Sequence, residues 1–379
     1  MTTVPTEGIQ RTYEIHRYGA ANFFYVTLFG VVLMTGLIFI SPNLGPAVPI
    51  KVAYHRIKVS LQRPIQVHYY NRPPWVKMDI FSECDNNCYL TADDWNLNAD
   101  SEVVIFHTPY VKEVHPRKKQ GQIWVFHSLE PPWLHWCKLK NWTREFNWTM
   151  SYRRDSDILY TYADFQTQEM SESTWETETR KLGKTLRKKS TDIAWMVSHC
   201  GTPGKRDDYV NILKKMIPVD VYGKCGDKNC DRWKGAACLE LYKFYLSFEN
   251  QLCEDYITEK SFSLYYPSFS SIPITRGGSN YSMFLPPGSY IDSSEFQHIS
   301  HLKNYIDSVS KNITKMMEYM RWRKHYQLIE DHAKPFCELC RRLHLKDTEK
   351  YRRVYRDIGE WQRRDKTERK ICKDPHDLS

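Results

Sequence analysis

The order of strand-like and helix-like segments after residue 190 constrains the fold of this chain more than any other feature. Short apolar runs that are typical of buried strands lie at 192–200, 219–223, 242–249 and 271–277, and a helical pattern lies at 206–216. Strands that alternate with helical crossovers are typical of a parallel sheet with helices on its faces. The sequence therefore predicts an α/β fold for this part of the chain.

The remaining segments follow other patterns. EVVIFHTPY at 102–110 and QIWVFHSLE at 122–130 are typical of buried strands that end in polar residues. Residues 165–190 are polar and charged, which favours an inter-domain linker or a mobile loop. Apolar residues recur at helical spacing from Ile299 to Met320 and predict an amphipathic helix. At 379 residues, the chain is long enough for two domains.

An apolar segment near the N-terminus, residues 20–40, predicts a membrane anchor. It lies in a charge-free span from Tyr18 to Ile50, and about 20 apolar residues match the length of a bilayer-spanning helix. A cleaved signal peptide is the alternative, but the run is long for one and no small-residue cleavage site follows it. We therefore expect a cytosolic tail at 1–19, a transmembrane signal anchor at 20–40 and a Pro-punctuated stem at 41–65.

The orientation of this segment is inferred from the rest of the chain, because positively charged residues flank it on both sides. Four glycosylation sequons and 11 cysteines follow it and favour a lumenal, oxidising compartment, which is a type II topology. The sequon asparagines are Asn141, Asn147, Asn280 and Asn312.

The cysteines predict a disulfide-bonded body. Their odd number leaves at least one free or intermolecular thiol. Three local groups favour short loop staples: Cys84/Cys88, Cys225/Cys230/Cys238 and Cys337/Cys340/Cys372. Zinc is the alternative for Cys337 and Cys340, because a CxxC with His332 and His344 nearby has ligand spacing, although no second CxxC lies at a matching distance.

The net charge of +9 is concentrated in late segments such as CRRLHLKDTEKYRRVYRD and WQRRDKTERK. Such runs can bind nucleic acid, but a lumenal domain meets none. A solvated helical face, or attraction to an anionic ligand or a membrane surface, accounts for them better.

A ligand site is expected where the apolar run 244–248 leads into ENQLCEDYITEK at 249–260. A buried strand followed by carboxylates, an amide and a lysine is typical of a site at the carboxyl edge of an α/β sheet. No Walker loop, GxGxxG, HExxH or GxSxG motif is present, so ATPase, dehydrogenase, zincin and hydrolase functions lack their signatures.

Two pairs of residues at expected helix starts are candidates for binding a ligand, and three of the four residues are cations suited to an anion. Lys205 and Arg206 follow a loop that contains glycine and proline, and a helix N-terminus with cations is a typical phosphate or pyrophosphate site. Lys260 lies in a short helix that Thr258 could cap, and Glu259 beside it could face a sugar hydroxyl or a developing positive charge. Surface charge and helix capping are the alternative interpretations.

Glu130 is a candidate general base. It ends a strand that carries Trp124 and Phe126, and two prolines follow it, so burial could raise its pKa. The alternative is a solvated strand end.

These candidates fall within motifs that resemble one family. FNWTMSYRRDSDI, AWMVSHCGTPGKRDDYVNIL, VDVYGKCG, KFYLSFENQLCEDYITEK and SNYSMFLPPGSYI look like successive motifs of the α-1,3-fucosyltransferases of glycosyltransferase family 10, which are type II membrane enzymes of the Golgi. The C-terminal CELCRRLH segment resembles invertebrate and core-type members of the family more than the shorter vertebrate Lewis-type ones.

The resemblance implies an α/β fold of the GT-B type, in which two Rossmann-like domains face a cleft behind a single-pass transmembrane helix. With the patterns above, it places an acceptor-side domain at 66–190, a GDP-fucose-binding domain at 191–335 and a Cys-containing basic extension at 336–379. The expected reaction is an inverting transfer, in which the 3-hydroxyl of an N-acetylglucosamine displaces GDP from GDP-fucose. The expected partners are GDP-fucose, a glycan acceptor on a glycoprotein or glycolipid, and the Golgi membrane.

Carried over residue by residue, the resemblance makes Glu130 the base that takes the acceptor proton and Glu259 the acidic partner near fucose. Arg206 and Lys260 would neutralise the departing diphosphate. The full set of expected donor-binding residues is Arg206, Asn250, Tyr256 and Lys260.

No tightly bound cofactor is implied by the resemblance, and a divalent metal is not required by the mechanism. Asp155 and Asp157 have the spacing of a metal-binding DxD, but in the similar family SYRRDSDI is a structural motif.

Two alternatives stay open at the level of sequence. A lumenal glycan-binding protein or an inactive relative would keep the fold and lose the base or a cation, and a core-type enzyme would use a different acceptor from an antennal, Lewis-type one. One departure from the family pattern is Pro267, which should end the helix after ITEK early.

Overall fold

The computed structural model describes residues 62–92, 101–134, 138–189, 191–230, 238–345 and 353–378. The predicted cytosolic tail, the transmembrane helix at 20–40 and all but the last residues of the predicted stem lie outside this set. Within it, no helix is long and apolar enough to cross a membrane.

The first of two large sheets is built from residues before 160. All of its neighbouring strands are parallel, in the order β2-β1-β3-β4-β5-β6. Its strands are β1 (Ile65–Tyr69), β2 (Cys88–Ala92), β3 (Val103–His107), β4 (Ile123–Ser128), β5 (Trp148–Ser151) and β6 (Ile158–Leu159). The two central strands β3 and β4 are buried along their whole length, as expected for a parallel sheet covered on both faces.

The second sheet is also parallel, in the order β13-β12-β10-β8-β9. Its strands are β8 (Thr191–Met196), β9 (Val219–Tyr222), β10 (Tyr242–Phe248), β12 (Ile272–Arg276) and β13 (Ile291–Asp292). Together, the two sheets confirm the predicted α/β class with parallel sheets, and each predicted strand named above coincides with an observed one to within a few residues.

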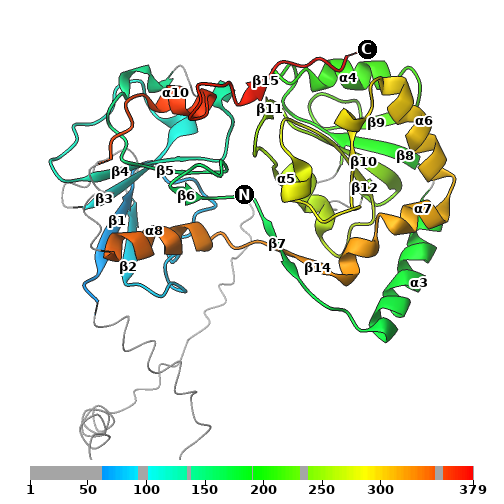
Figure 1. Cartoon of the computed structure of the whole chain (residues 1–379), viewed down its shortest axis with the longest axis horizontal. Coiled ribbons are helices and arrows are strands. Elements are labelled where there is room, and N and C mark those ends of the chain that lie inside the picture. The colour runs from blue at the N-terminus through cyan, green and yellow to red at the C-terminus, as the bar shows by residue number, and fades with distance from the viewer. Residues whose placement is uncertain are drawn as a thin grey trace, which may run out of the picture. The chain divides into compact units, whose positions relative to one another are not determined.

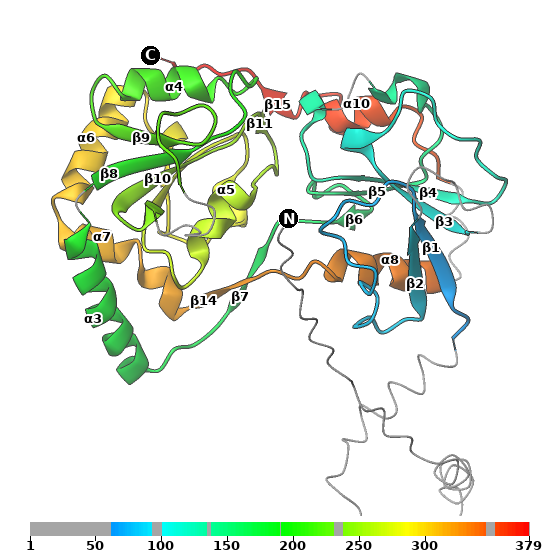
Figure 2. The same cartoon turned by 180° about the vertical axis from the view of Figure 1, so that it is seen from behind.

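Helices gather around the second sheet, as Figures 1 and 2 show. They are α3 (Glu172–Lys188), α4 (Arg206–Leu213), α6 (Ile299–Ser310) and α7 (Ile313–Glu318). The apolar residues predicted to form one helix from Ile299 to Met320 pack into one core with β10, but the helix breaks where Asn312 caps α7. A short α5 (Glu259–Phe262) precedes Pro267, so the early end predicted for this helix is confirmed.

The segment at 165–190 is not the mobile loop that was one of the two expectations, although it does connect the strands of the first sheet to those of the second. The segment forms β7 (Asp164–Thr167) and the 17-residue helix α3, whose N-cap Ser171 accepts a hydrogen bond from the backbone N–H of Thr174. Only Leu182 and Leu186 of this helix are fully buried, in the core of the second sheet. The buried leucines are four positions apart, as expected for a helix, but most of the other residues are charged or polar, which favoured the interpretation as an unstructured connection.

The chain returns to the first sheet after residue 330. β14 (Tyr326–Ile329) pairs antiparallel with β7, and α8 (Lys334–His344) then packs against the first sheet (Figure 1). Phe336, Leu339 and Cys340 of α8 are fully buried in the same core as β1 and β3. A short α10 (Ile358–Arg363) and β15 (Cys372–Lys373) follow, and β15 pairs with β11 (Leu252–Cys253).

Short 3-10 helices make many of the connections. They are η1 (Thr108–Tyr110), η2 (Pro132–Leu134), η3 (Lys138–Asn141), η5 (Ser263–Tyr265), η6 (Tyr281–Met283), η7 (Ser293–Glu295) and η8 (Arg321–Lys324).

Three of the five disulfides among the described residues join cysteines more than one hundred positions apart. The bonds are Cys84–Cys337, Cys88–Cys340, Cys200–Cys225, Cys230–Cys238 and Cys253–Cys372. Only Cys230–Cys238 falls within a predicted local group, so the expectation of local staples was otherwise wrong. Because the sulfurs of Cys337 and Cys340 are bonded to other cysteines, this CxxC does not offer thiolates to zinc. Cys137, the remaining cysteine, lies outside the described residues.

Candidate active site

A cavity of about 810 Å³ gathers most of the residues that the sequence singled out. Glu130, which follows β4 of the first sheet, contributes to its wall. Residues that follow β8 and β10 of the second sheet form much of the rest. Five of the six expected site residues line it, namely Glu130, Arg206, Asn250, Glu259 and Lys260.

Glu130 is half-buried at the cavity wall. Its backbone N–H donates to the hydroxyl of Ser128, 3.0 Å away, which turns the chain sharply at the end of β4 before Pro131 and Pro132. Burial raises the pKa of the Glu130 carboxyl above its usual range, and the nearby ammonium of Lys260 only partly opposes this. A carboxylate with a raised pKa is suited to accept a proton near neutral pH.

Tyr256 does not line the cavity, but its hydroxyl donates a 3.4 Å hydrogen bond to Oε2 of Glu130. The ring of Tyr256 is buried beside Tyr152, at a centroid distance of 5.0 Å. The structure therefore puts Tyr256 in contact with the expected base. The expected role of Tyr256 in donor binding stays a prediction.

The ammonium of Lys260 lies among three oxygen-bearing side chains. It is 3.0 Å from Oε1 of Glu259, 3.4 Å from Oε2 of Glu249 and 2.8 Å from the hydroxyl of Thr258, which also caps α5 as predicted. Burial alone would lower the pKa of Lys260, but the two carboxylates outweigh it and raise the pKa. Lys260 is therefore a firmly charged cation at the cavity wall.

The two carboxylates beside Lys260 differ in their exposure. The side chain of Glu259 is 62% exposed, whereas that of Glu249 is fully buried. Burial would raise the pKa of Glu259, but the ammonium of Lys260 outweighs burial and lowers this pKa. The Glu259 carboxylate is therefore ionised and, because it is exposed, can face a ligand. Burial is the largest influence on Glu249 and raises its pKa.

Arg206 begins α4 and is almost completely buried. Its guanidinium donates to the backbone oxygen atoms of Phe248, at 2.9 Å, and His199, at 2.8 Å. Burial lowers the pKa of Arg206, although a guanidinium stays charged in proteins. Lys205, the neighbouring candidate, is exposed at the N-cap of α4 with φ of 47° and does not line the cavity.

Asn250 directly follows Glu249 at the end of β10 and is buried at the cavity. Its backbone oxygen accepts a 2.9 Å hydrogen bond from Gly204, whereas its Oδ1 has no partner among the described residues. Buried polar atoms are rarely left without partners. The Oδ1 of Asn250 is therefore available to a ligand with a donor group.

The sequence did not reveal several residues that line the cavity or that support its wall from behind. Nothing in the motif predicted a role for Glu249, although it is the buried partner of Lys260 and accepts hydrogen bonds from both the backbone N–H and the hydroxyl of Thr258. The aromatic lining also went unrecognised, because no local pattern distinguishes it from core: Tyr110, Tyr162, Tyr245, Tyr266 and Phe269.

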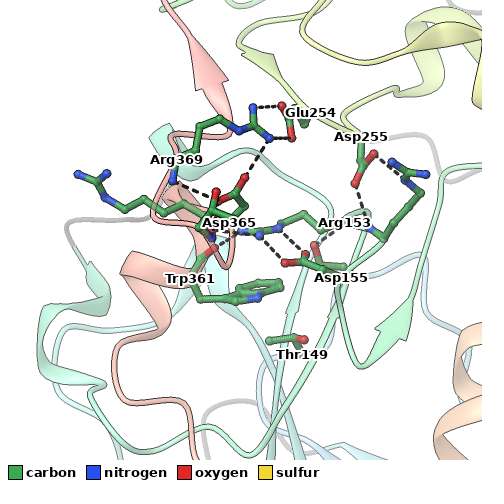
Figure 3. A network of polar contacts seen from close by, with 12 residues as sticks. Thr149, Arg153, Asp155, Glu254, Asp255, Trp361, Asp365 and Arg369 are labelled. Carbon is green, nitrogen blue, oxygen red and sulfur yellow. Dashed lines mark hydrogen bonds and ion pairs between the residues drawn. The ribbon is translucent and has the colours of Figure 1, made fainter.

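The other acidic residues of the quoted motifs point elsewhere. Glu254 pairs with Arg369, and Asp255 pairs with Arg154 at 2.9 Å (Figure 3). In SYRRDSDI, the carboxylate of Asp157 accepts from the backbone N–H of Thr149, at 2.8 Å, and from the hydroxyl of Tyr355, at 2.8 Å. The structural role that the resemblance implied for this motif agrees with these contacts.

The arrangement offers two firm positive charges beside a half-buried carboxylate. Arg206 and Lys260 can hold an anion such as a diphosphate, because cations at a low-dielectric wall stabilise negative charge strongly. Glu130, contributed by the other sheet, can take a proton from a second substrate in the same cavity.

Family profiles match both halves of the chain. The profile described as "Fucosyltransferase, N-terminal" matches residues 62–163, and "Glycosyltransferase family 10 (fucosyltransferase) C-term" matches residues 186–361. The second match contains Arg206, Asn250, Glu259 and Lys260, and the first contains Glu130. The chain belongs to glycosyltransferase family 10.

Relatives of this family 10 chain include fucosyltransferases of insects and vertebrates. Alpha-(1,3)-fucosyltransferase C of Drosophila melanogaster is 34% identical over 280 residues, which cover 69% of this chain and 65% of the relative. The human 4-galactosyl-N-acetylglucosaminide 3-alpha-L-fucosyltransferase FUT6 is 32% identical over 73% of this chain and 75% of its own length. The aligned part thus spans just under two thirds of the Drosophila protein.

Among solved structures, a crystal structure of an alpha1,3-fucosyltransferase with GDP-fucose is similar to this family 10 chain. The sequence identity is 14%, the TM-score is 0.49, and the match covers 86% of this chain and 97% of that one.

Proposed function

We propose that the chain transfers L-fucose from GDP-fucose to the 3-hydroxyl of an N-acetylglucosamine in a glycan, with inversion at the anomeric carbon. The observation that carries the proposal is the joint presence of Glu130, Arg206 and Lys260 at one cavity, because the reaction needs a base for the acceptor and positive charge for the leaving diphosphate.

The chemistry follows from the proposed positions of the two substrates. The acceptor hydroxyl loses its proton to the carboxylate of Glu130 as its oxygen bonds to the anomeric carbon of fucose. The bond between that carbon and the diphosphate oxygen breaks, and its electron pair leaves with GDP. Attack from the face opposite the leaving group turns the β-linked donor into an α-linked product.

Each remaining site residue has a role in this scheme. Arg206 and Lys260 neutralise the departing diphosphate, and the exposed carboxylate of Glu259 faces the positive charge that develops at the anomeric carbon. The unpartnered Oδ1 of Asn250 accepts a hydrogen bond from the donor nucleotide sugar. Because two fixed cations already serve the diphosphate, we propose that transfer does not require a divalent metal or a tightly bound cofactor.

The proposed architecture is of the GT-B type. Acceptor binding is assigned to the first sheet, within residues 66–190, and GDP-fucose binding to the second, within 191–335. The extension at 336–379 returns to both sheets through α8 and β15. We further propose that residues 20–40 anchor the chain in the Golgi membrane with the described residues in the lumen, which agrees with their disulfides.

The test is fucose transfer by a secreted form that lacks residues 1–41, with GDP-fucose and defined glycans that carry antennal or core N-acetylglucosamine. Replacing the base, Glu130→Gln, should lower kcat by about 10²–10⁴-fold while GDP binding is retained. Transfer that is lost in the variant supports the assignment, and the acceptor that is used separates antennal from core specificity.

Two other results would favour the alternatives. Binding of GDP-fucose without transfer to any glycan would favour a lumenal binding protein or an inactive relative. A folded wild-type protein that does not bind GDP-fucose would contradict the proposed function.

A further inference from the structure

A buried arginine links the end of the chain to the loop that precedes Arg206. Arg276, the last residue of β12, is 2% exposed. Its guanidinium donates to both carboxylate oxygens of Asp377, each at 2.7 Å, and to the backbone oxygen of Gly204, at 2.6 Å. It also lies over the ring of Tyr209, 4.9 Å from the centroid. One arginine side chain thus connects the carboxylate of Asp377 to this loop.

The loop at Gly204 is pressed against the end of β10. The backbone N–H of Gly204 donates to the oxygen of Asn250, at 2.9 Å, and a Cβ placed on Gly204 would lie 3.0 Å from that oxygen and 3.1 Å from the oxygen of Glu249. Lys205 follows with a left-handed backbone, and Arg206 then begins α4. The position of Gly204 therefore sets the relative position of Arg206 and Asn250.

Asp377 reaches Arg276 from residues 364–378, which we call the C-terminal strap. The strap is held at several points before it reaches Asp377. Arg153 donates to the backbone oxygen of Arg364, at the start of the strap, and to that of Trp361 in α10 just before it. Arg369 pairs with both Glu254 and Asp365 (Figure 3).

Closer to Asp377, the strap is joined to β11 by a disulfide and by strand pairing. Cys372 forms a disulfide with Cys253, and β15 pairs with β11, which begins two residues after Asn250. Because these contacts already order the strap, little further conformational entropy is lost when Asp377 meets Arg276.

We propose that Asp377 is a positioning residue for the donor nucleotide. Its carboxylate fixes the guanidinium of Arg276 in the orientation that holds the backbone oxygen of Gly204, and the loop then presents Arg206 to the diphosphate. The inference rests on the proposed function, which places GDP-fucose at Arg206.

Two opposite effects would follow from removing the charge of Asp377. Loss of the bidentate contact frees the Arg276 guanidinium and loosens the loop, which weakens GDP binding. An uncompensated Arg276 also adds positive charge near the site, which would strengthen the binding of an anion. The proposal requires the first effect to be larger, so the direction of the change tests it.

The experiment compares Asp377→Asn with a matched control, Glu368→Gln. Glu368 lies in the same strap and is exposed, and its neutralisation changes the net charge equally. The dissociation constant of GDP is measured by calorimetry on the secreted protein, and the Michaelis constants of GDP-fucose and of the acceptor are measured separately.

The expected result is a rise of about ten-fold in the dissociation constant of GDP and in the KM of GDP-fucose for Asp377→Asn, the size of one lost charge-assisted hydrogen bond. The KM of the acceptor should stay constant, Glu368→Gln should behave like wild type, and Asp377→Glu should restore part of the affinity. Unchanged or tighter GDP binding by folded Asp377→Asn would overturn the proposal.

A double variant covers the case in which the single change prevents folding. Arg276→Met with Asp377→Asn leaves no buried unpaired charge, and the methionine can pack on Tyr209. This variant should fold and still bind GDP about ten-fold more weakly, because Gly204 has lost its anchor. Wild-type affinity in the double variant would overturn the inference alone, whereas a wild-type protein that does not bind GDP would overturn the proposed function and this inference with it.

Discussion

The hydroxyl of Tyr256 lies 3.4 Å from Oε2 of Glu130, although the two residues are 126 positions apart in the sequence. Glu130 follows β4 of the first sheet, and Tyr256 lies between β11 and α5, beyond β10 of the second. The contact therefore joins the proposed base to the motif that carries the proposed donor residues. It also provides a direct way to alter the pKa of the base without removing it.

Replacing Tyr256 by phenylalanine should move the acid limb of the pH profile of kcat/KM to higher pH. Transfer requires the ionised form of Glu130, so the rate falls as the pH drops through the pKa of this group. Burial raises this pKa, and the hydroxyl of Tyr256 partly lowers it by donating to the carboxylate. Without the hydroxyl, the pKa rises further and the limb shifts upward.

The control for this variant is Tyr152→Phe. Tyr152 packs against the ring of Tyr256, but the hydroxyl that donates to Glu130 belongs to Tyr256. Removing the hydroxyl of Tyr152 therefore changes the same aromatic pair and leaves this hydrogen bond in place. An acid limb that stays in place for Tyr256→Phe, or that moves equally for Tyr152→Phe, would contradict the assignment of the limb to Glu130 and its contact.

Lys260 and Lys205 should differ sharply in their importance for the donor, although both are lysines at helix starts. Lys260→Met should lower kcat/KM for GDP-fucose by about 10²–10³-fold, because a cation that faces the leaving diphosphate is lost. Lys205→Met should change it by less than about three-fold, because Lys205 is exposed outside the cavity and surface charges contribute little. Steady-state kinetics with varied GDP-fucose checks both values, and comparable losses would refute the difference.

The bond Cys253–Cys372 should stabilise the protein more than Cys230–Cys238. The sequence separations are 119 and 8 residues, and the chain-entropy contributions of closing such loops are about 5 and about 2.5 kcal/mol. Replacing each pair by alanine and measuring urea unfolding should show the larger loss of stability for Cys253 and Cys372. Equal losses would mean that chain entropy does not control the difference.

The sequon at Asn147 should remain unmodified in the folded protein. Asn147 is 5% exposed, its Nδ2 donates to the backbone oxygen of Arg353 at 2.9 Å, and its Oδ1 accepts from the backbone N–H of Trp124. An attached glycan would break these buried contacts. Asn141 is exposed and is the positive control. Peptide mass spectrometry of the secreted protein measures occupancy at both sites, and a glycan on Asn147 of folded protein would disprove the prediction.

Strand positions were predictable because burial in a parallel sheet leaves a local trace. The apolar runs before Glu130 and before Glu249 gave β4 and β10 to within a residue or two. The site residues after them could also be found, since side chains at the carboxyl ends of parallel strands are natural ligand positions. In contrast, α3 was missed because most of its 17 residues other than Leu182 and Leu186 are charged or polar.

Within ENQLCEDYITEK, the sequence did not distinguish which charged residues face the cavity. Glu259 and Lys260 line it, whereas Glu254 and Asp255 pair with Arg369 and Arg154. The partners lie more than one hundred positions away, so nothing within the motif reveals them.

The sequence by itself determined the α/β class, the positions of the main strands and the types of residue at their ends, because these depend on periodicity and turn chemistry over a few neighbouring residues. Only the tertiary structure decided which cysteines pair, that Tyr256 contacts Glu130, and that Asp377 reaches Arg276. Such contacts depend on how distant segments pack together, and many pairings of the same residues are compatible with one sequence pattern. Packing in the folded chain selects one of them, and the resulting burial and neighbouring charges together set the charge states of the groups at the site.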